Sequence, residues 1–175
     1  AAETKVQLPP HNPAGEEVAL PVAATVRIAP QGTAEPIPEH ATAYRLGENI
    51  ELLGYDIPDV VRSQQPLTLT LYWRTGAPLT ADYKVFVHLR DTAGVIIAQQ
   101  DGQPRGGRYP TTAWRADKVI PDTHQLTIPT LAPGQELQLL IGLYQPETLE
   151  RLPVSGPEGA LPDGTIVLSL PTTGE

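Results

Sequence analysis

LTLTLYWRTGAPLTADYKVFVHLRD, residues 67–91, is the stretch that decides the fold. Apolar and polar side chains alternate in its first part, from Leu67 to Arg74, and again in its last part, from Tyr83 to Arg90. A period of two is typical of a strand with one buried face. The TGAPLTAD segment between the two parts contains the Gly, Pro and Asp of a connection, so we predict a hairpin of two long antiparallel strands.

The apolar register of this stretch predicts which side chains enter the core. Residues 137–144 show the same alternation and are predicted to supply a third core strand. The predicted core residues are Leu67, Leu69, Leu71, Trp73, Val85, Val87, Leu89, Leu137, Leu139, Ile141 and Leu143.

Further strand patterns occur along the chain between turn residues. They lie at residues 50–57, 95–99, 119–128 and 166–170. Helix is not expected, because the 20 Pro and 15 Gly interrupt helices. About eight or nine strands without a helix predict an all-β fold, an antiparallel two-sheet β-sandwich of jelly-roll or immunoglobulin-like topology.

Composition divides the chain into three parts. Residues 1–40 are rich in Pro, Glu and Ala and are predicted to form a linker or N-terminal extension, with one edge strand at residues 22–28. Residues 41–171 are predicted to form the sandwich, and residues 172–175 a tail.

Charge and residue usage exclude several classes of function. The formal net charge of −8 argues against nucleic acid and anionic membranes as partners, because both need clustered Lys and Arg. The lack of Cys excludes disulfides, a thiol nucleophile and thiolate metal sites. The chain also lacks Met, so we expect a processed or excised piece of a longer protein, with any signal or membrane anchor outside this sequence.

Familiar catalytic motifs are not found in the sequence. No serine lies in a G-x-S-x-G turn, and the four His residues are isolated from one another, which argues against a serine hydrolase and a zinc enzyme. We therefore expect no enzymatic activity and no cofactor.

Four carboxylates fall near predicted strand ends. They are Asp91, Asp101, Asp117 and Asp122. We interpret them as solvated turn residues that hydrogen-bond their own backbone. A structural calcium site and a pair of glycosidase carboxylates are the alternatives.

Two other side chains have a structural and a functional interpretation. Trp114 is predicted to close one end of the core, with sugar stacking as the alternative, because an indole combines a large apolar area with one N–H donor. His124 is predicted to be a strand residue with local hydrogen bonds rather than a metal ligand.

Several segments together carry a resemblance to a known domain. The segments are IELLGYDI, LTLTLYWR, DYKVFVHLRD, YPTTAWR, and the PG turn before LLIGLYQPETLERLPV. Between about residues 43 and 170 the chain resembles the C-terminal β-sandwich domain of bacterial multi-pass membrane proteins similar to dolichyl-phosphate-mannose-type protein mannosyltransferases. The resemblance implies an extracytoplasmic, non-catalytic appendage of an envelope glycosylation enzyme, and it does not extend to the transferase itself.

The outward face of the predicted hairpin supplies the candidate binding site. If Arg74 pairs with Lys84, the register places Tyr72 beside Phe86, pointing away from the core. Aromatic rings stack on sugars while Arg and His hydrogen-bond sugar hydroxyls. The predicted glycan-binding residues are Tyr72, Arg74, Phe86, His88 and Tyr144. The alternative is that the N-terminal segment covers this patch.

These observations lead to a function hypothesis with one rival. We expect a non-catalytic, extracytoplasmic module, secreted, periplasmic or on the cell surface, that binds an oligosaccharide and belongs to a larger envelope or glycosyltransferase-like protein. The rival is a structural spacer or protein–protein interaction domain without a small-molecule ligand, which contacts an adjacent domain of the parent chain.

Overall fold

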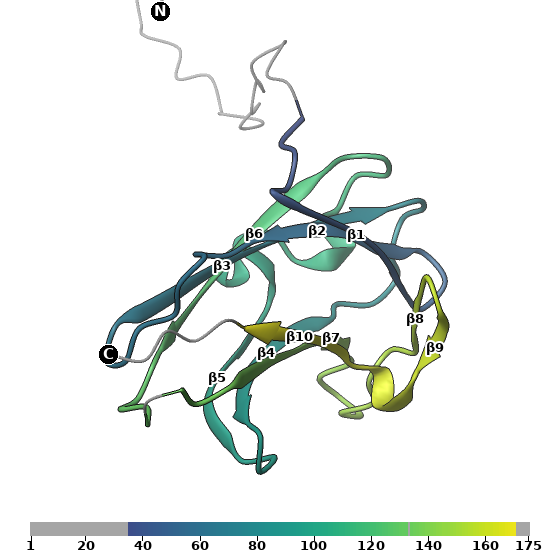
Figure 1. Cartoon of the computed structure of the whole chain (residues 1–175). Coiled ribbons are helices and arrows are strands. Elements are labelled where there is room, and N and C mark those ends of the chain that lie inside the picture. The colour runs from purple at the N-terminus through teal and green to yellow at the C-terminus, as the bar shows by residue number, and fades with distance from the viewer. Residues whose placement is uncertain (1–34, 133, 171–175) are drawn as a thin grey trace, which may run out of the picture. The chain divides into compact units, whose positions relative to one another are not determined.

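The computed structural model describes residues 35–132 and 134–170, and in these residues ten strands form two antiparallel sheets (Figure 1). The six-stranded sheet contains, in spatial order, β6 (Ile120–Thr127), β3 (Pro66–Thr75), β2 (Ile50–Asp56), β1 (His40–Leu46), β8 (Val154–Gly156) and β9 (Gly159–Leu161). The four-stranded sheet contains β10 (Ile166–Leu170), β7 (Leu137–Tyr144), β4 (Lys84–Asp91) and β5 (Ile96–Gly102).

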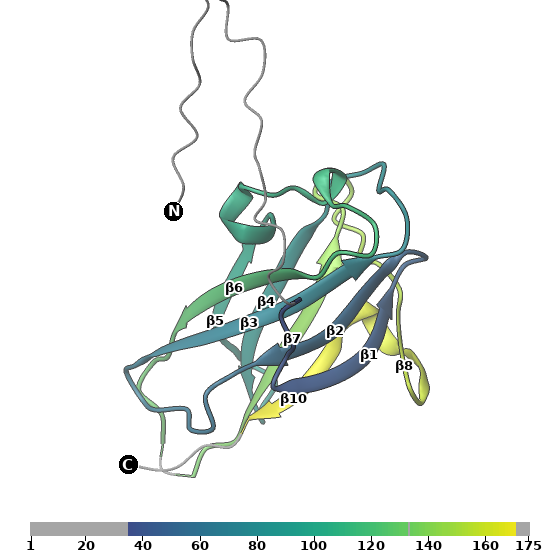
Figure 2. The same ribbon diagram turned by 90° about the horizontal axis from the view of Figure 1, so that it is seen from above.

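The two sheets lie one above the other in Figure 1, and the view from above in Figure 2 shows β6, β3, β2 and β1 side by side in front of the four-stranded sheet. The predicted two-sheet all-β sandwich is therefore confirmed. Among the described residues, helical turns are confined to the short 3-10 segments Pro104–Gly107, Thr111–Ala113 and Pro162–Gly164. No helix in this part of the chain is long and apolar enough to cross a membrane.

Two domain predictions cannot be compared with this fold over their whole length. The edge strand predicted at residues 22–28, the linker up to residue 34 and the tail at 172–175 lie outside the described residues. Where the predicted linker meets the sandwich, the backbone N–H of Glu39 donates a 2.7 Å hydrogen bond to Asp56 Oδ1 on β2.

The predicted hairpin is wrong, because its two strands belong to different sheets. β3 pairs with β2 and β6, whereas β4 pairs with β5 and β7. Arg74 consequently lies opposite Glu51, and Lys84 lies opposite Tyr144. The alternation of apolar residues defines an inward face for each strand. The same alternation occurs in two strands that pair side by side and in two strands that face each other across a core, so it does not identify the partner of a strand. The connection between them is long enough to span the roughly 10 Å between packed sheets.

The connection between β3 and β4 is held by a buried threonine. Thr111 Oγ1 donates to the Ala81 carbonyl at 2.9 Å and accepts from the Tyr83 backbone N–H at 2.9 Å. Next to it, the Asp82 carboxylate accepts hydrogen bonds from the backbone N–H and the hydroxyl of Thr112, which hold the pKa of Asp82 below its usual range. The crossover is thus fixed by polar contacts to the second 3-10 turn after β5, Thr111–Ala113.

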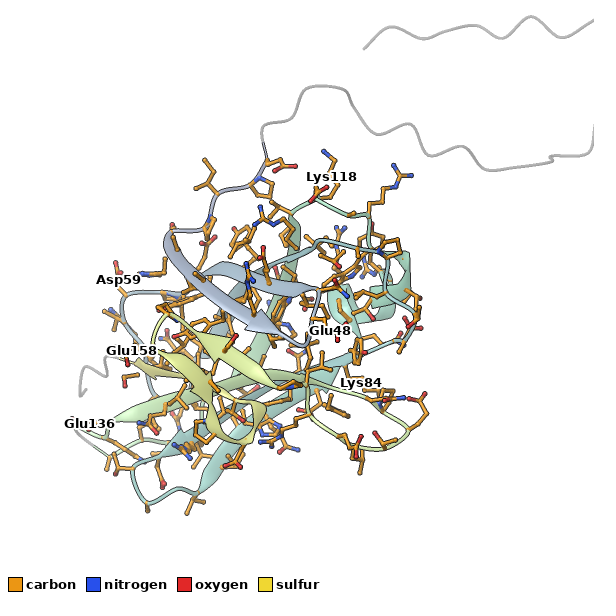
Figure 3. The ribbon with its side chains drawn as sticks, turned by 90° about the vertical axis from the view of Figure 1, so that its right-hand side faces the viewer. Glu48, Asp59, Lys84, Lys118, Glu136 and Glu158 are labelled. Atoms are coloured by element: carbon orange, nitrogen blue, oxygen red, sulfur yellow. The ribbon has the colours of Figure 1, made fainter. Side chains whose placement is uncertain are left out.

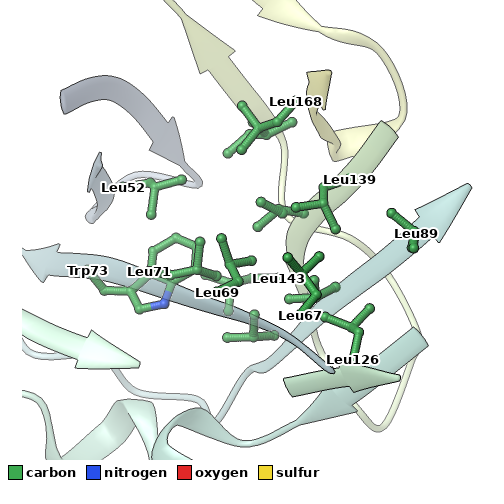
Figure 4. Close-up of a cluster of buried hydrophobic side chains, with 14 of the residues drawn as sticks. Leu52, Leu67, Leu69, Leu71, Trp73, Leu89, Leu126, Leu139, Leu143 and Leu168 are labelled. Carbon is green, nitrogen blue, oxygen red and sulfur yellow. The ribbon is translucent and has the colours of Figure 1, made fainter. Parts of the chain in front are cut away.

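The core lies between the sheets, and all eleven predicted core residues are at most 2% exposed (Figure 4). Trp114 joins them at 3% exposure, as the core interpretation predicted. Its ring lies 6.5 Å from that of Trp73, and its Nε1–H donates to the Tyr109 carbonyl at 3.2 Å. An indole at this position extends the apolar core while its single donor remains paired.

A buried polar group connects the two sheets where β6 lies close to β5. His124 on β6 hydrogen-bonds Asp122 Oδ2 at 2.8 Å through Nε2, and Gln100 Oε1 on β5 at 3.0 Å through Nδ1. The predicted local hydrogen bond of His124 is therefore confirmed by its contact with Asp122, two residues away, whereas the bond to Gln100 crosses to the other sheet. The interpretation of Asp122 as a solvated turn residue is wrong: it is 1% exposed on the inward face of β6, where Arg105 N–H also donates to it.

Three strands were missed by the sequence analysis. β1 has few large apolar residues, and β8 and β9 contain only three residues each, so neither length nor alternation identifies them. β5 also extends to Gly102, beyond the strand pattern predicted at residues 95–99, so Asp101 is a strand residue and its interpretation as a turn residue is wrong.

Replacing Leu69 by Ala is expected to lower the free energy of unfolding by about 2–5 kcal/mol, because the buried side chain leaves a cavity between the sheets. Urea denaturation followed by tryptophan fluorescence measures the change. Thr68→Ala is the matched control, since Thr68 is exposed on the same strand and its loss is expected to change stability by less than about 0.5 kcal/mol. Equal effects of the two variants would contradict the placement of the core.

Candidate functional site

The five predicted glycan-binding residues do not form one patch. Tyr72 and Arg74 lie on the outward register of β3 in the six-stranded sheet. Phe86, His88 and Tyr144 lie on the outward register of β4 and β7 in the four-stranded sheet. The two groups are on opposite sides of the sandwich because their strands face each other across the core.

On the six-stranded sheet, the polar atoms of the predicted site are bound to neighbouring side chains. The Tyr72 hydroxyl donates a short hydrogen bond to Asp56 Oδ2, and the tyrosine is only 8% exposed. This hydrogen bond, together with burial, raises the pKa of Tyr72 to about 12. Arg74 donates to Glu51 Oε2 through Nε at 3.1 Å and Nη2 at 2.6 Å.

A proline from the segment before β1 packs onto the same face. Gly54 is the cross-strand partner of Tyr72, and a Cβ at Gly54 would lie 2.5 Å from Pro38 Cγ. The chain that enters the sandwich therefore packs closely over β2 beside Tyr72. This arrangement agrees with the alternative that the N-terminal segment covers this part of the predicted patch.

On the four-stranded sheet, five side chains form a contiguous group that we call the Phe86 cluster. Its members are Phe86, His88, Asp101, Tyr144 and Arg151. The ring of Phe86 lies 5.2 Å from that of His88 and 6.4 Å from that of Tyr144, and the Arg151 guanidinium carbon lies 4.5 Å above its centre.

Phe86 is the floor of this cluster rather than an exposed platform. Although it lies on the outward register, it is only 1% exposed. Its ring occupies the space above Gly142, where an added Cβ would lie 2.5 Å from two ring carbons. With Gly142 below and the Arg151 guanidinium above, the ring has no free face for stacking on a sugar.

The polar members surround this floor. His88 Nε2 and Asp101 Oδ1 lie 2.8 Å apart, and their side chains are 17% and 33% exposed. Burial and the neighbouring Asp101 carboxylate raise the pKa of the half-buried Tyr144. Arg151 Nη1 donates to Thr165 Oγ1 at 3.0 Å and to the Asp163 carbonyl at 3.3 Å, which fixes the guanidinium over Phe86.

Sequence reasoning missed Asp101 and Arg151 as members of the cluster. Asp101 lies opposite Phe86 only because a bulge shifts the β4–β5 register near Leu89, and the sequence does not show that bulge. Arg151 joins through an isolated bridge with Tyr144 after a loop of irregular structure. The available signal was the turn between β4 and β5. Asp91 and Gly94 form this turn, and the pairing register of the two strands is counted from it.

The polar side chains of the cluster are partly exposed to solvent. Two hollows of about 500 and 120 Å³ lie elsewhere, and none of their lining residues belongs to the cluster. Within the described ranges, no group of three or more His, Cys, Asp and Glu side chains is placed to hold a metal ion. Asp91, one of the carboxylates considered for calcium, accepts the Val95 backbone N–H at 2.9 Å and so stabilises a turn.

Comparisons with known proteins give no family assignment. No family model and no curated protein matches the chain. A CARDB domain from Pyrococcus furiosus, crystallised with di-metal ions, is similar over 77% of this chain and 97% of its own, with 11% identity and a TM-score of 0.43. The β-glucuronidase of Bacteroides uniformis is similar over 63% of this chain but only 13% of its own, with 13% identity and a TM-score of 0.39. These weak likenesses carry no functional argument, and none supports the mannosyltransferase-type parent.

Asp56→Asn is expected to lower the pKa of Tyr72 from about 12 toward the ordinary value of 10.0, because the charged acceptor of its hydroxyl is removed. The folded state holds this proton more tightly than the unfolded state. The pair therefore stabilises the fold below about pH 10, and the stabilisation is lost as the pH rises through about 12. Ultraviolet titration of tyrosinate measures the pKa shift. The Tyr72→Phe variant shows which part of the titration curve belongs to Tyr72. An unchanged titration in Asp56→Asn would refute the contact.

Gly142→Ala is expected to lower the free energy of unfolding by about 1–3 kcal/mol, because the new methyl group displaces the Phe86 ring. Gly102→Ala on β5 is the control, since a Cβ there meets no atom within 4 Å. Urea denaturation compares the two variants. If Gly142→Ala is as stable as the control, the ring does not rest on Gly142.

Proposed function

We propose that the domain is a non-catalytic carbohydrate-binding module, and that its binding surface is the Phe86 cluster on the outer face of the four-stranded sheet. The observation that carries the proposal is the arrangement of a half-buried tyrosine, a carboxylate, a histidine and an arginine around one buried ring. This surface keeps three of the five residues expected from the sequence and replaces the other two by Asp101 and Arg151.

The cluster supplies the groups that sugar recognition requires. A tyrosine ring presents an apolar face to the C–H groups of a pyranose, and Tyr144 is partly accessible, unlike the buried Phe86. Asp101 accepts hydrogen bonds from sugar hydroxyls, while Arg151 and His88 offer N–H groups. Phe86 does not contact the ligand in this arrangement, and its role is to position the polar side chains around it.

Preorganisation of these side chains favours binding at a shallow surface. Arg151 is fixed by Thr165 and by the ring of Phe86, and Asp101 is fixed by His88. Side chains that are already ordered lose little conformational entropy when a ligand binds. The site therefore needs no deep pocket for weak binding.

The biological setting of the module is part of the same proposal. The sequence resemblance described above supports an extracytoplasmic location and a larger envelope or glycosyltransferase-like parent protein. In that setting the module would hold a glycan close to an adjacent domain, and no catalytic step is assigned to its own residues.

The structural spacer remains a second candidate because of one specific observation. His88 pairs with Asp101, and Arg151 pairs with Thr165 and Phe86, so these contacts close the outer face even without a ligand. A spacer needs no more than that. Direct binding measurements separate the two candidates.

Titration of the isotopically labelled chain with a panel of oligosaccharides at millimolar concentration, followed by amide NMR spectra, tests the proposal. We expect shifts in β4, β5 and β7, and we expect Tyr144→Ala to weaken binding about tenfold or more, equivalent to about 1.4 kcal/mol. Arg74→Ala, on the opposite face, is the control and is expected to bind normally. The absence of shifts with every saccharide, or shifts confined to the six-stranded sheet, would favour the spacer instead.

A further inference from the structure

Two cations flank Tyr144 in the sheet. Lys84 on β4 is the direct cross-strand partner of Tyr144, and Arg151 is its partner on the other side. Directly opposite residues share a face of the sheet, with Cβ atoms about 4.5–5.5 Å apart. Tyr144, the residue proposed to stack on a sugar, therefore has a lysine and an arginine as its two neighbours on this face of the sheet.

Both cations have unused donors. The side chain of Lys84, labelled in Figure 3, makes no hydrogen bond or ion pair within the described part of the chain. Arg151 uses only Nη1 for its hydrogen bonds to Thr165 and Asp163, so Nε and Nη2 have no partner there. By contrast, Arg74 on the opposite face is neutralised by Glu51, and Lys118 pairs with Glu35.

The acidic residues nearby do not neutralise these cations. Asp101 Oδ1 contacts His88 Nε2 and lies in no ion pair with Lys84 or Arg151 among the described residues. Glu147 and Glu150, in the loop after β7, are exposed and likewise form no ion pair in this part of the structure. Two cations with free donors thus remain beside Tyr144 in a chain whose net charge is −8.

We infer that the ligand of this surface is an acidic saccharide, whose carboxylate or sulfate group binds between Lys84 and Arg151 while its ring stacks on Tyr144. Charge-assisted hydrogen bonds from an ammonium and a guanidinium are the strongest contacts that an exposed surface offers to such a group. Asp101 and His88 then serve the hydroxyl groups of the same sugar. This inference rests on the proposed function and adds the chemical class of the ligand.

The test compares two oligosaccharides of equal length and linkage, one built from a neutral hexose and one from the corresponding hexuronic acid. Calorimetric or NMR titration of the full chain is expected to show at least about tenfold tighter binding of the acidic oligomer, with an advantage that falls as salt is added. Lys84→Gln is expected to remove most of this preference and to leave binding of the neutral oligomer nearly unchanged. Lys118→Gln alters the net charge equally at a distant loop and is expected to preserve the preference.

The outcomes distinguish the inference from the function on which it rests. Equal binding of the two oligomers, or equal loss of preference in the two lysine variants, would overturn the acidic-ligand inference and leave the carbohydrate-binding function standing. Failure of both oligomers and of the wider panel to bind would overturn the function and the inference together. Because Arg151 also covers Phe86, Arg151→Lys rather than a neutral variant is used to examine the second cation.

Discussion

The packing of β3 against β4 across the core is the contact on which the rest of the structure depends. Leu69 and Leu71 on one strand and Val87 on the other are fully buried in the same apolar cluster. Because these inward side chains lie between the sheets, the residues that alternate with them must point to opposite surfaces. The separation of Tyr72 from Phe86 is therefore a direct consequence of core packing.

Several of the buried polar groups among the described residues fix the relation between the sheets. Thr111 bonds the backbone on both sides of Asp82 and so anchors the crossover from β3 to β4. Asp122 and His124 lie on the inward face of β6, where a hydrophobic pattern would place apolar residues, and His124 reaches Gln100 on the facing sheet. A buried polar group is costly without partners, so this network favours one alignment of the two edges over others.

The sequence predicted what depends on periodicity and missed what depends on pairing. Leu69 and Val87 were placed correctly because alternation defines an inward face whatever strand lies beside it. The partner of each strand was not predicted, since the same pattern fits a hairpin and a pair of facing strands. For the site, Phe86 and Tyr144 prove to be neighbours because β4 and β7 pair, whereas Asp101 depends on a bulge and Arg151 on an isolated bridge, neither of which has a local sequence signal.

On the outer face of each sheet, a neighbouring segment or side chain packs over or beside an aromatic residue. The two faces differ in how many polar groups remain unpaired, and this difference indicates where a ligand would bind. On each face a glycine in an inner strand allows close approach: Gly142 receives the ring of Phe86, and Gly54, opposite Tyr72, receives Pro38. On the six-stranded sheet, the hydroxyl of Tyr72 and the guanidinium of Arg74 are both engaged by carboxylates. On the four-stranded sheet, the guanidinium of Arg151 covers Phe86 with its flat face. This contact and the hydrogen bonds of Nη1 leave other N–H groups of Arg151 without a partner among the described residues. A surface that is ordered by its own contacts and still has free donors is suited to recognition, and this is why the proposed site lies on the four-stranded side.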